Sequence, residues 1–511
     1  MARSMLLGID VGTTGLKAVL FDEDGTVLGS SSVEYATLHP GPAWAEQDPG
    51  DWWNATREAV RNAMAQARAG GRDIAAIGVS CQAPTALPIS RDGRPLRPAL
   101  IWMDRRSGEQ CEWMARAIGH DTILEITGNR IDPYYVASKI LWIKQHEPDL
   151  FHNTHKFLQV NGYINYKLTG EFTMDICHGG LTQLFDQQKG EWSYTLCEAM
   201  GIPPEKLPEV YPCSAVIGGL NTKAASELGI SAGTPVVAGT VDGAAAAVEA
   251  GAVRSGQACE MTGQSTVLLI CTERLLPSFE LISFQHAVPS RFLMVGAMVA
   301  TGGSLKWFRD QLASAETSAA ALLKMDAFDL MTLEASKAPV GAGGLVFLPY
   351  MLGERSPIWN TKARGVVFGL SLATTRGELI RAVMEGSAYG LRHNIEVAES
   401  LGVSVPELRC VGGGAKSGEW NQIKADVLGK PVLVPETPVG APLGDAIIAG
   451  VGAGIYPDVA GAAEEIVKVK ARFEPRPANH KKYAEFYSIY RELYAQLEGT
   501  FEHLHRAVNP T

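Results

Sequence analysis

The sequence predicts an α/β protein built from two domains of like topology. Its 511 residues exceed what one domain usually holds, so two large domains are expected. Runs with β-strand character at residues 5–9, 16–21 and 26–31 precede a helical period over 51–70 and a buried strand at 74–82. Strands that give way to alternating helix and strand are typical of an α/β domain with a mixed sheet.

A related pattern recurs in the second half of the chain. Residues 259–272 again place a small polar turn between two β-prone runs, and a long helical segment follows at 375–402. This repetition indicates an internal duplication with a boundary near residues 251–256. The expected domains are therefore residues 1–251 and 252–511.

Short signals define individual elements. Asp24-Gly25 favours a hairpin turn between the second and third strands. Asp51 is the expected N-cap of the first helix, and Gly70 is its expected end. The last helix, residues 480–506, carries an aromatic stripe that we interpret as core packing, formed by Tyr483, Phe486, Tyr487, Tyr490 and Tyr494.

Composition excludes several classes of partner and compartment. A net charge of −10 argues against nucleic acid and against an anionic membrane surface. We expect a cytoplasmic protein, because the start lacks the long apolar segment of a signal peptide and no apolar run is long enough to span a membrane. The eight cysteines form no C-x-x-C pair and are expected to be free, small hydrophobic residues. The H-x-x-H of His152 and His155 is interpreted as surface, since no third ligand lies at a useful spacing.

Three glycine-containing turns could hold phosphate, at residues 10–17, 262–266 and 411–420. Glycines let the backbone approach a ligand, and its N–H groups together with Thr or Ser hydroxyls form a donor-rich concavity. The chain has no G-x-x-x-x-G-K-[ST] motif. The first turn is followed by a strand rather than a helix, which also excludes a dinucleotide-binding turn. A phosphate clamp between two strands is the remaining interpretation.

These residues resemble the FGGY family of carbohydrate kinases. The resemblance rests on "GIDVGTTGLKAVLFDEDG", "WAEQDPGDWW", "AGTVDGAAAAVEAGAV", "FLPYMLGERSPIWNTKARGVVFGL" and "VGGGAKSGEWNQIKADVLGKPV", which stand in the family's order over residues 5–455. It implies two actin-like ATPase domains of the ribonuclease H-like type with a catalytic cleft between them. ATP would bind mostly to the second domain and the sugar to the first. Whether the chain forms a homodimer is left open.

The resemblance also implies roles for individual residues. Asp10 would help to hold Mg²⁺, and Asp242 would be the base that takes the proton of the attacking hydroxyl. From its residues alone, Asp242 is more readily interpreted as a helix N-cap than as a base, and it is the resemblance that favours the base. The residues expected to contact ATP are Gly12, Thr13, Thr14, Lys17, Thr262, Gly263, Gly302, Lys306, Gly414 and Gly418.

The expected substrate residues are Gln82, Ala83, Trp102, Asp104, Tyr134 and Asp242. Glycerol kinases have Gln-Arg-Glu-Thr where this chain has Gln82-Ala83-Pro84-Thr85, and xylulose kinases usually have Gln-Met-His-Gly. Gly243 also replaces the Asn that xylulose kinases tend to carry. The overall similarity nevertheless favours the ketopentose kinases, with D-xylulose phosphorylated to D-xylulose 5-phosphate. A kinase for another ketose or polyol, such as ribulose, erythritol or a glycerol-like substrate, is the alternative.

Two alternatives belong to other functional classes. A non-catalytic or chaperone-type actin-like ATPase shares the Asp-Gly-Thr turn, but a long β-rich peptide-binding region should then follow the ATPase. A catalytically inactive sugar sensor would not need both Asp10 and Asp242. The sequence therefore favours an enzyme.

Overall fold

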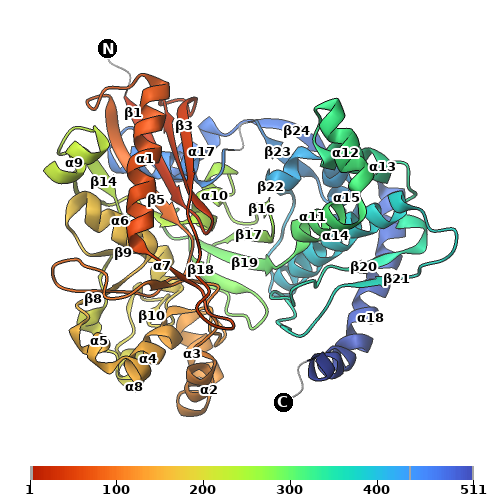
Figure 1. Ribbon diagram of the computed structural model, residues 1–511, viewed down its shortest axis with the longest axis horizontal. Helices are drawn as coiled ribbons and strands as arrows, with labels where there is room; N and C mark the ends of the chain where they lie inside the picture. The colour runs from red at the N-terminus through yellow and green to blue at the C-terminus, as the bar shows by residue number, and fades with distance from the viewer. Residues whose placement is uncertain (1–3, 437–438, 509–511) are drawn as a thin grey trace. The chain divides into compact units, whose positions relative to one another are not determined.

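The computed structural model describes residues 4–436 and 439–508, which divide into two compact units (Figure 1). Unit 1 takes its described residues from Met1–Ser255, Cys271–Met294 and Val439–Val467, and unit 2 takes the rest. The first change of unit, after Ser255, lies at the predicted boundary. The units are not the continuous segments 1–251 and 252–511, however, because two later segments return to unit 1.

Unit 1 is built on a mixed sheet in the order β13-β14-β5-β1-β2-β3, with β15 beside β5. The predicted hairpin is present: β1 runs antiparallel to β2, while β5 lies parallel on its other side. The strands of this sheet are β1 (Met5–Val11), β2 (Gly15–Phe21), β3 (Val27–Glu34), β5 (Ile74–Cys81), β13 (Val216–Gly219), β14 (Pro235–Val237) and β15 (Thr240–Val241).

Helices cover both faces of this sheet. Leu7, Ile9 and Val11 of β1 share a core with α1 (Pro49–Ala67), so α1 lies on one face. Gly8 points the other way, where a Cβ would lie 2.0 Å from the carbonyl oxygen of Pro442 in α16 (Ala441–Gly452). Because side chains alternate along a strand, α16 covers the opposite face. This close packing explains why residues 439–467 belong to unit 1.

The helix that follows the expected base also packs closely against α16. A Cβ on Gly444 of α16 would lie 2.0 Å from the carbonyl oxygen of Ala245 in α10 (Asp242–Glu249). The small residues "GAAAA" of α10 therefore permit this close approach.

The other elements of unit 1 are short. Its remaining helices are α2 (Gly108–Ala117), α3 (His120–Thr127), α4 (Val136–His146), α5 (Pro148–Asn153), α6 (Val160–Thr169), α7 (Ile176–Gly180), α8 (Tyr194–Met200), α9 (Thr222–Leu228) and α17 (Val459–Ile466). Its remaining strands are β4 (Glu46–Gln47), β6 (Leu87–Ile89), β7 (Ala99–Leu100), β8 (Lys156–Leu158), β9 (Thr173–Asp175), β10 (Phe185–Asp186), β11 (Glu191–Trp192), β12 (Glu209–Tyr211) and β18 (Ile282–Gln285).

Unit 2 repeats the sheet pattern of unit 1 in the order β19-β17-β16-β22-β23-β24. Here β16 pairs antiparallel with β17 and parallel with β22, just as β1 pairs with β2 and β5. The predicted duplication is therefore visible in the topology. The strands are β16 (Ala258–Thr262), β17 (Thr266–Thr272), β19 (Phe292–Met298), β22 (Leu408–Gly412), β23 (Val432–Pro435) and β24 (Val469–Phe473), with β20 (Val346–Leu348) and β21 (Val366–Phe368) forming a separate pair.

The helices of unit 2 pack around a second hydrophobic core. They are α11 (Thr301–Leu312), α12 (Ser314–Leu323), α13 (Ala327–Ala335), α14 (Arg376–Ser400), α15 (Gly418–Leu428) and α18 (Pro477–Val508). Tyr483, Tyr487 and Tyr490 of α18 are buried in this core, and Phe486 and Tyr494 pack against it. The interpretation of this stripe as packing is confirmed.

The first helix begins earlier than predicted. Its N-cap is Asp48, whose carboxylate accepts a hydrogen bond from the backbone N–H of Gly50, and not Asp51. Pro49 can occupy the first turn because a proline needs no hydrogen-bond acceptor there. The helix ends at Ala67, because the next residue, Arg68, adopts the left-handed conformation. The predicted end, Gly70, lies three residues beyond Ala67.

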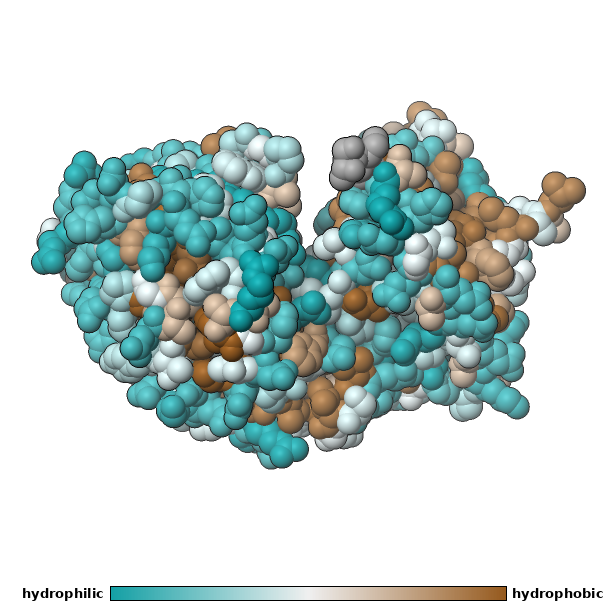
Figure 2. Space-filling view, turned by 90° about the horizontal axis from the view of Figure 1, so that it is seen from below, coloured by the Kyte–Doolittle hydropathy of each residue, from teal (hydrophilic) through white to brown (hydrophobic). Residues whose placement is uncertain are grey.

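The distribution of cysteines and of hydrophobic residues agrees with the predictions made from composition. All eight cysteines are free and buried, as predicted. On the face drawn in Figure 2, hydrophilic residues predominate and hydrophobic residues form small groups between them. Within residues 4–436 and 439–508, no helix has both the length and the hydropathy that crossing a membrane requires.

Candidate active site

The first glycine turn lies between β1 and β2 of unit 1 and is held by side chains around it. The N–H of Gly12 donates to the carbonyl of Gly15 at 3.0 Å, which closes the turn. The Tyr35 hydroxyl donates to the Gly12 carbonyl, and the Gln47 amide donates to the Thr13 carbonyl at 2.7 Å. The carbonyls of Gly12, Thr13 and Gly15 are thereby occupied by donors within the protein. Thr14 is exposed.

Asp10 and Asp242 both belong to unit 1, at the ends of strands that flank β5. Asp10 is aligned with Ser80 of β5, and Val241, which precedes Asp242, is aligned with Cys81. The sheet register therefore brings to neighbouring strand ends two acids that are far apart in the sequence. Asp242 begins α10, and its carboxylate accepts a hydrogen bond from the N–H of Gly243 at 2.6 Å. It is the first residue of the helix rather than its N-cap, which is Val241.

Two further acids complete a cluster with Asp10 and Asp242. Glu249, at the end of α10, is fully buried and accepts from the N–H of Gly440 at 2.7 Å. Asp445 of α16 is buried and accepts from the Ser80 hydroxyl at 2.7 Å. Lys17 supplies a positive charge, and its ammonium group donates to the carbonyl of Val439 at 2.5 Å.

Burial raises the pKa of all four acids of this cluster. Burial and then the neighbouring charge of Asp242 raise the pKa of Asp10 to about 8. Burial raises the pKa of Asp242 to about 6 and that of Glu249 to about 7. Burial, with Asp10 and Asp242 nearby, raises the pKa of Asp445 well above its usual value. Poor solvation of the charged form is the common cause, and neighbouring acids add to it for Asp10 and Asp445.

Sequence reasoning missed Glu249 and Asp445. Each had a detectable signal, because each is an acid inside an otherwise apolar helical run, "GAAAAVEAGAV" and "PLGDAIIAG". A charged residue in such a run is rarely buried without a partner or a function. The partners could not be inferred, because Ser80 and Asp445 are 365 positions apart.

The expected substrate residues lie in several different environments. The Trp102 indole donates to the Thr13 hydroxyl at 2.9 Å, which joins this residue to the first glycine turn. The Tyr134 hydroxyl donates to the carbonyl of Ala83 at 3.0 Å. Gln82 is buried, and its amide donates to Gln47 at 2.6 Å. These contacts bring Trp102 and Gln82 to the same turn and attach Tyr134 to the segment that follows Gln82.

Asp104 does not fit the predicted role of a substrate contact. It is fully buried, and its two oxygens accept hydrogen bonds from the Arg106 guanidinium and from the N–H of Ala45. Arg106 in turn lies 3.7 Å from the centre of the Trp44 ring. Asp104 therefore fixes the loop that carries Trp102, and we do not include it among the proposed substrate contacts.

A buried His–Asp pair lies behind the base. His178 Nδ1 is 2.5 Å from Asp175 Oδ2, and its Nε2 is 3.3 Å from the Cys81 sulfur. The charge of His178 acts to lower the pKa of Asp242, against the larger effect of burial. Sequence reasoning did not identify this pair. Of the predicted H-x-x-H, His152 is exposed, and His155 packs its ring against Phe172.

In unit 2, the second glycine turn lies against two other elements. A Cβ on Gly302 would lie 1.9 Å from the carbonyl oxygen of Gly263, and one on Gly414 would lie 2.8 Å from the Thr262 side chain. The start of α11 and the turn after β22 therefore approach the β16–β17 turn as closely as glycine permits. The Thr262 hydroxyl is bound to Glu260 and Thr266.

These three elements, together with α13 and the start of α15, line a pocket of about 330 Å³ that is formed wholly by unit 2. Its apolar walls are Leu305, Phe328 and Trp420, and its polar rim includes Lys306 and Asp329. An apolar slot next to glycine turns suits a base and ribose beside phosphates. The predicted nucleotide residues Thr262, Gly263, Gly302, Lys306 and Gly414 all line it. Lys306 also pairs with Asp310 at 2.9 Å.

Gly418 differs from this group. It lines a neighbouring pocket on the other side of the segment Gly412–Lys416 and is not among the residues that line the larger one. The sequence could not show that Gly414 and Gly418 face different pockets, because the short segment that precedes Gly418 lines both pockets.

Comparison with known proteins agrees with this arrangement. The N-terminal domain of the FGGY family of carbohydrate kinases matches residues 5–249, and its C-terminal domain matches residues 261–453. A xylulose kinase of Bacillus subtilis is 31% identical over 491 residues, 96% of each chain. A gluconokinase of Bacillus licheniformis is 29% identical over 500 residues, covering 98% of this chain and 97% of the relative.

Solved structures give the same result. The crystal structure of xylulose kinase from Rhodospirillum rubrum superposes with a TM-score of 0.88 at 31% identity, covering 98% of this chain and 100% of that one. Both family domains are thus present over nearly the full length, and the two-domain α/β fold is that of the family. The chain belongs to the FGGY family of carbohydrate kinases.

Proposed function

We propose that this carbohydrate kinase transfers the terminal phosphate of ATP to a hydroxyl of D-xylulose and forms D-xylulose 5-phosphate. The observation that carries the proposal is the pairing of Asp10 and Asp242 at neighbouring strand ends of unit 1, beside a donor-rich turn. Xylulose kinases at about one third identity over nearly the whole chain support this acceptor.

In this proposal Asp242 accepts the proton of the attacking hydroxyl. Its pKa of about 6 leaves the carboxylate mostly ionised at neutral pH, yet basic enough to take a proton as the oxygen attacks. The hydrogen bond from Gly243 fixes one carboxylate oxygen, so the other is available to the acceptor. Gln82, Ala83, Trp102 and Tyr134 are the proposed contacts of the sugar.

The turn at Gly12–Gly15 would hold phosphate oxygens through its N–H groups and the Thr13 hydroxyl. Lys17 would contribute positive charge near them. The pocket of unit 2 would hold the rest of the nucleotide, with the base between Leu305, Phe328 and Trp420. Phosphoryl transfer depends mainly on such alignment and charge neutralisation.

The acid cluster fits a magnesium ion. Asp10 Oδ1 is buried and, within residues 4–436 and 439–508, accepts no hydrogen bond. A buried carboxyl oxygen with no hydrogen-bond donor, in a cluster of acids, is a suitable ligand for a hard cation, which would favour the ionised form of Asp10. We propose that Asp10 holds the ion, directly or through water, with Asp445 behind it. A bound Mg²⁺ would neutralise phosphate charge.

A substrate panel tests the proposal. The enzyme is incubated with ATP, Mg²⁺ and one of D-xylulose, D-ribulose, erythritol, glycerol or gluconate, and ADP release is coupled to an optical signal. We expect the highest kcat/KM with D-xylulose. A higher kcat/KM with gluconate would instead favour the second candidate, which the gluconokinase relative supports. ATP hydrolysis that no added substrate accelerates would point to a non-catalytic actin-like ATPase.

Two further properties remain predictions. Eight buried cysteines that form no disulfide suit a reducing compartment, and we propose the cytoplasm. A homodimer is one expected assembly, which the mass measured by light scattering would decide.

A further inference from the structure

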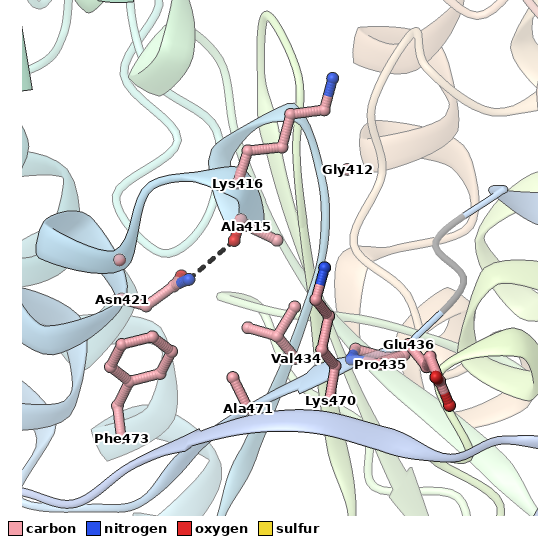
Figure 3. A pocket seen from close by; sticks show the side chains of 11 residues that line it. Gly412, Ala415, Lys416, Asn421, Val434, Pro435, Glu436, Lys470, Ala471 and Phe473 are labelled. Atoms are coloured by element: carbon pink, nitrogen blue, oxygen red, sulfur yellow. Dashed lines mark hydrogen bonds between the residues drawn. The ribbon is translucent and has the colours of Figure 1, made fainter. Parts of the chain in front are cut away.

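We propose that unit 2 carries a second small-molecule site, separate from the nucleotide pocket, for a planar anion that donates a hydrogen bond. The site is the pocket of about 200 Å³ between the segment Gly412–Lys416, the start of α15 and the β23–β24 pair (Figure 3). The proposal does not depend on which sugar the enzyme phosphorylates.

One of the residues that line this pocket, Asn421, has a buried amide oxygen without a partner among the described residues. Asn421 is 1% exposed, and its Nδ2 donates to the carbonyl of Ala415 at 2.8 Å. This contact fixes the amide orientation, because a carbonyl can only accept. Among the described residues, Asn421 Oδ1 then has no hydrogen-bond donor. A buried acceptor without a partner is costly, so a ligand N–H or O–H would be bound favourably here.

An uncovered aromatic ring forms one wall of the pocket. A Cβ on Gly418 would stand 3.8 Å from the Phe473 ring, so any larger residue at that position would cover the ring. Val434 and Ala471 face each other across the β23–β24 pair and extend the apolar wall. Figure 3 shows Asn421 and Phe473 on one side of the pocket and Lys470 and Glu436 on the other. This surface suits a flat apolar ring.

The rim of the pocket is positively charged. Lys416 and Lys470 are both exposed lining residues, and Glu436 offsets only one of the two charges. The carboxylate or phosphate of a bound ring would lie at this rim. An aromatic acid and a nucleoside monophosphate share this chemistry, so the two are separated by experiment.

Occupancy of this site would be coupled to the nucleotide. Lys416 lines both pockets, and the segment Gly412–Lys416 forms a wall of each. A ligand that fixes this segment on one side changes its freedom on the other. Such coupling is reciprocal, so the ligand and the nucleotide must alter each other's affinity by the same factor.

The test is calorimetric titration of the full chain with 4-hydroxybenzoate and, separately, with AMP. We expect at least one probe to bind saturably at one site. Ala471→Phe should abolish this binding by filling the pocket, and Lys470→Gln should weaken it by up to about fivefold, as for an exposed ion pair. Lys482→Gln, an exposed lysine on α18, is the matched control and should bind normally.

The outcomes identify the ligand source or overturn the site. Binding of 4-hydroxybenzoate alone identifies an aromatic acid, and AMP binding that persists with saturating ADP identifies a nucleoside monophosphate. AMP binding that ADP abolishes, and that Ala471→Phe leaves intact, would belong to the nucleotide pocket and would overturn the proposal. So would the absence of binding of both probes. Sugar kinase activity of Ala471→Phe distinguishes this failure from failure of the proposed function.

Discussion

Replacing Asp242 by Asn tests the proposed base most directly. The amide keeps the size of the carboxylate and an oxygen that can accept the 2.6 Å hydrogen bond from Gly243, so the start of α10 should be preserved. What is lost is the ability to take the hydroxyl proton. General base catalysis contributes roughly 10²–10⁴-fold to rate, which corresponds to about 3–5 kcal/mol of the barrier. We expect kcat to fall by that factor.

The pH dependence gives a second measure of the same residue. The base works in its ionised form, so the activity of the unaltered enzyme should fall as the pH drops below about 6. At pH 5 roughly one tenth of the base would remain ionised, and kcat/KM should fall about tenfold relative to its plateau. The small residual activity of Asp242→Asn should lack this inflection. Saturating Mg²⁺ is required, so that titration of Asp10 does not contribute.

The assay is steady-state phosphorylation of the best sugar in the panel, with nucleotide affinity and melting temperature measured on the same samples. Asp51→Asn, which makes the same chemical change at an exposed position of α1 in unit 1, is the control and should retain full activity. If Asp242→Asn folds, binds nucleotide and turns over within about tenfold of the original enzyme, the assignment of the base is wrong.

Three further predictions follow from the site. Asp10 has a pKa of about 8 in the folded protein, above its ordinary value, so the stability of the metal-free protein should fall as the pH rises from 5 to 8. Melting temperatures measured in the presence of a chelator should fall less over this pH range for Asp10→Asn than for the unaltered protein. Gly302→Ala places a Cβ 1.9 Å from the Gly263 carbonyl, and strain of about 1–3 kcal/mol should weaken calorimetric nucleotide binding at least severalfold. Trp102→Phe removes the hydrogen bond to Thr13, worth about 0.5–1.5 kcal/mol, and should lower kcat/KM about two- to tenfold.

Each of these has a contrary outcome. An equal loss of stability with pH in Asp10→Asn would show that other buried acids, such as Glu249, dominate the effect. Gly499→Ala is the control for the glycine change, because a Cβ there meets nothing within 4 Å. If both alanine variants bind nucleotide normally, the close approach at Gly302 is not needed for binding. Unchanged kinetics in Trp102→Phe would show that the Trp102 indole does not contribute to the substrate site.

Local chemistry made the glycine turns predictable from sequence. Gly12 and Gly263 each stand in a polar turn between two β-prone runs, and both turns are hairpins in the structure. The parallel neighbours β5 and β22 repeat the pattern, which is why duplication could be detected. The ends of helices were harder to predict from the sequence. Asp48 and Asp51 are both suitable N-cap residues, and only the backbone conformation at the start of α1 decides between them.

The contacts of the site could not be predicted in the same way. Asp104 has the sequence context of a substrate residue, but Arg106 turns back and occupies both of its oxygens. Asp445 lies in a segment that the continuous boundary assigned to the other domain. Its place beside Ser80 depends on α16 packing onto β5, where a Cβ on Gly78 would lie 2.3 Å from the Asp445 carbonyl. Such close backbone contacts between distant segments leave no local signal.

The acid cluster costs stability and therefore needs a reason beyond the fold. Asp10 Oδ1, Glu249 Oε2 and Asp445 Oδ1 are buried, and none accepts a hydrogen bond from a described residue. Each such group typically costs about 1–3 kcal/mol, and more if charged. Lys17, the nearby cation, directs its ammonium group to a backbone carbonyl, and its charge does not prevent the raised pKa of Asp10. Apolar residues in these positions would give a more stable unit. A cation and a reacting hydroxyl that complete the site would explain why acids are found in these positions.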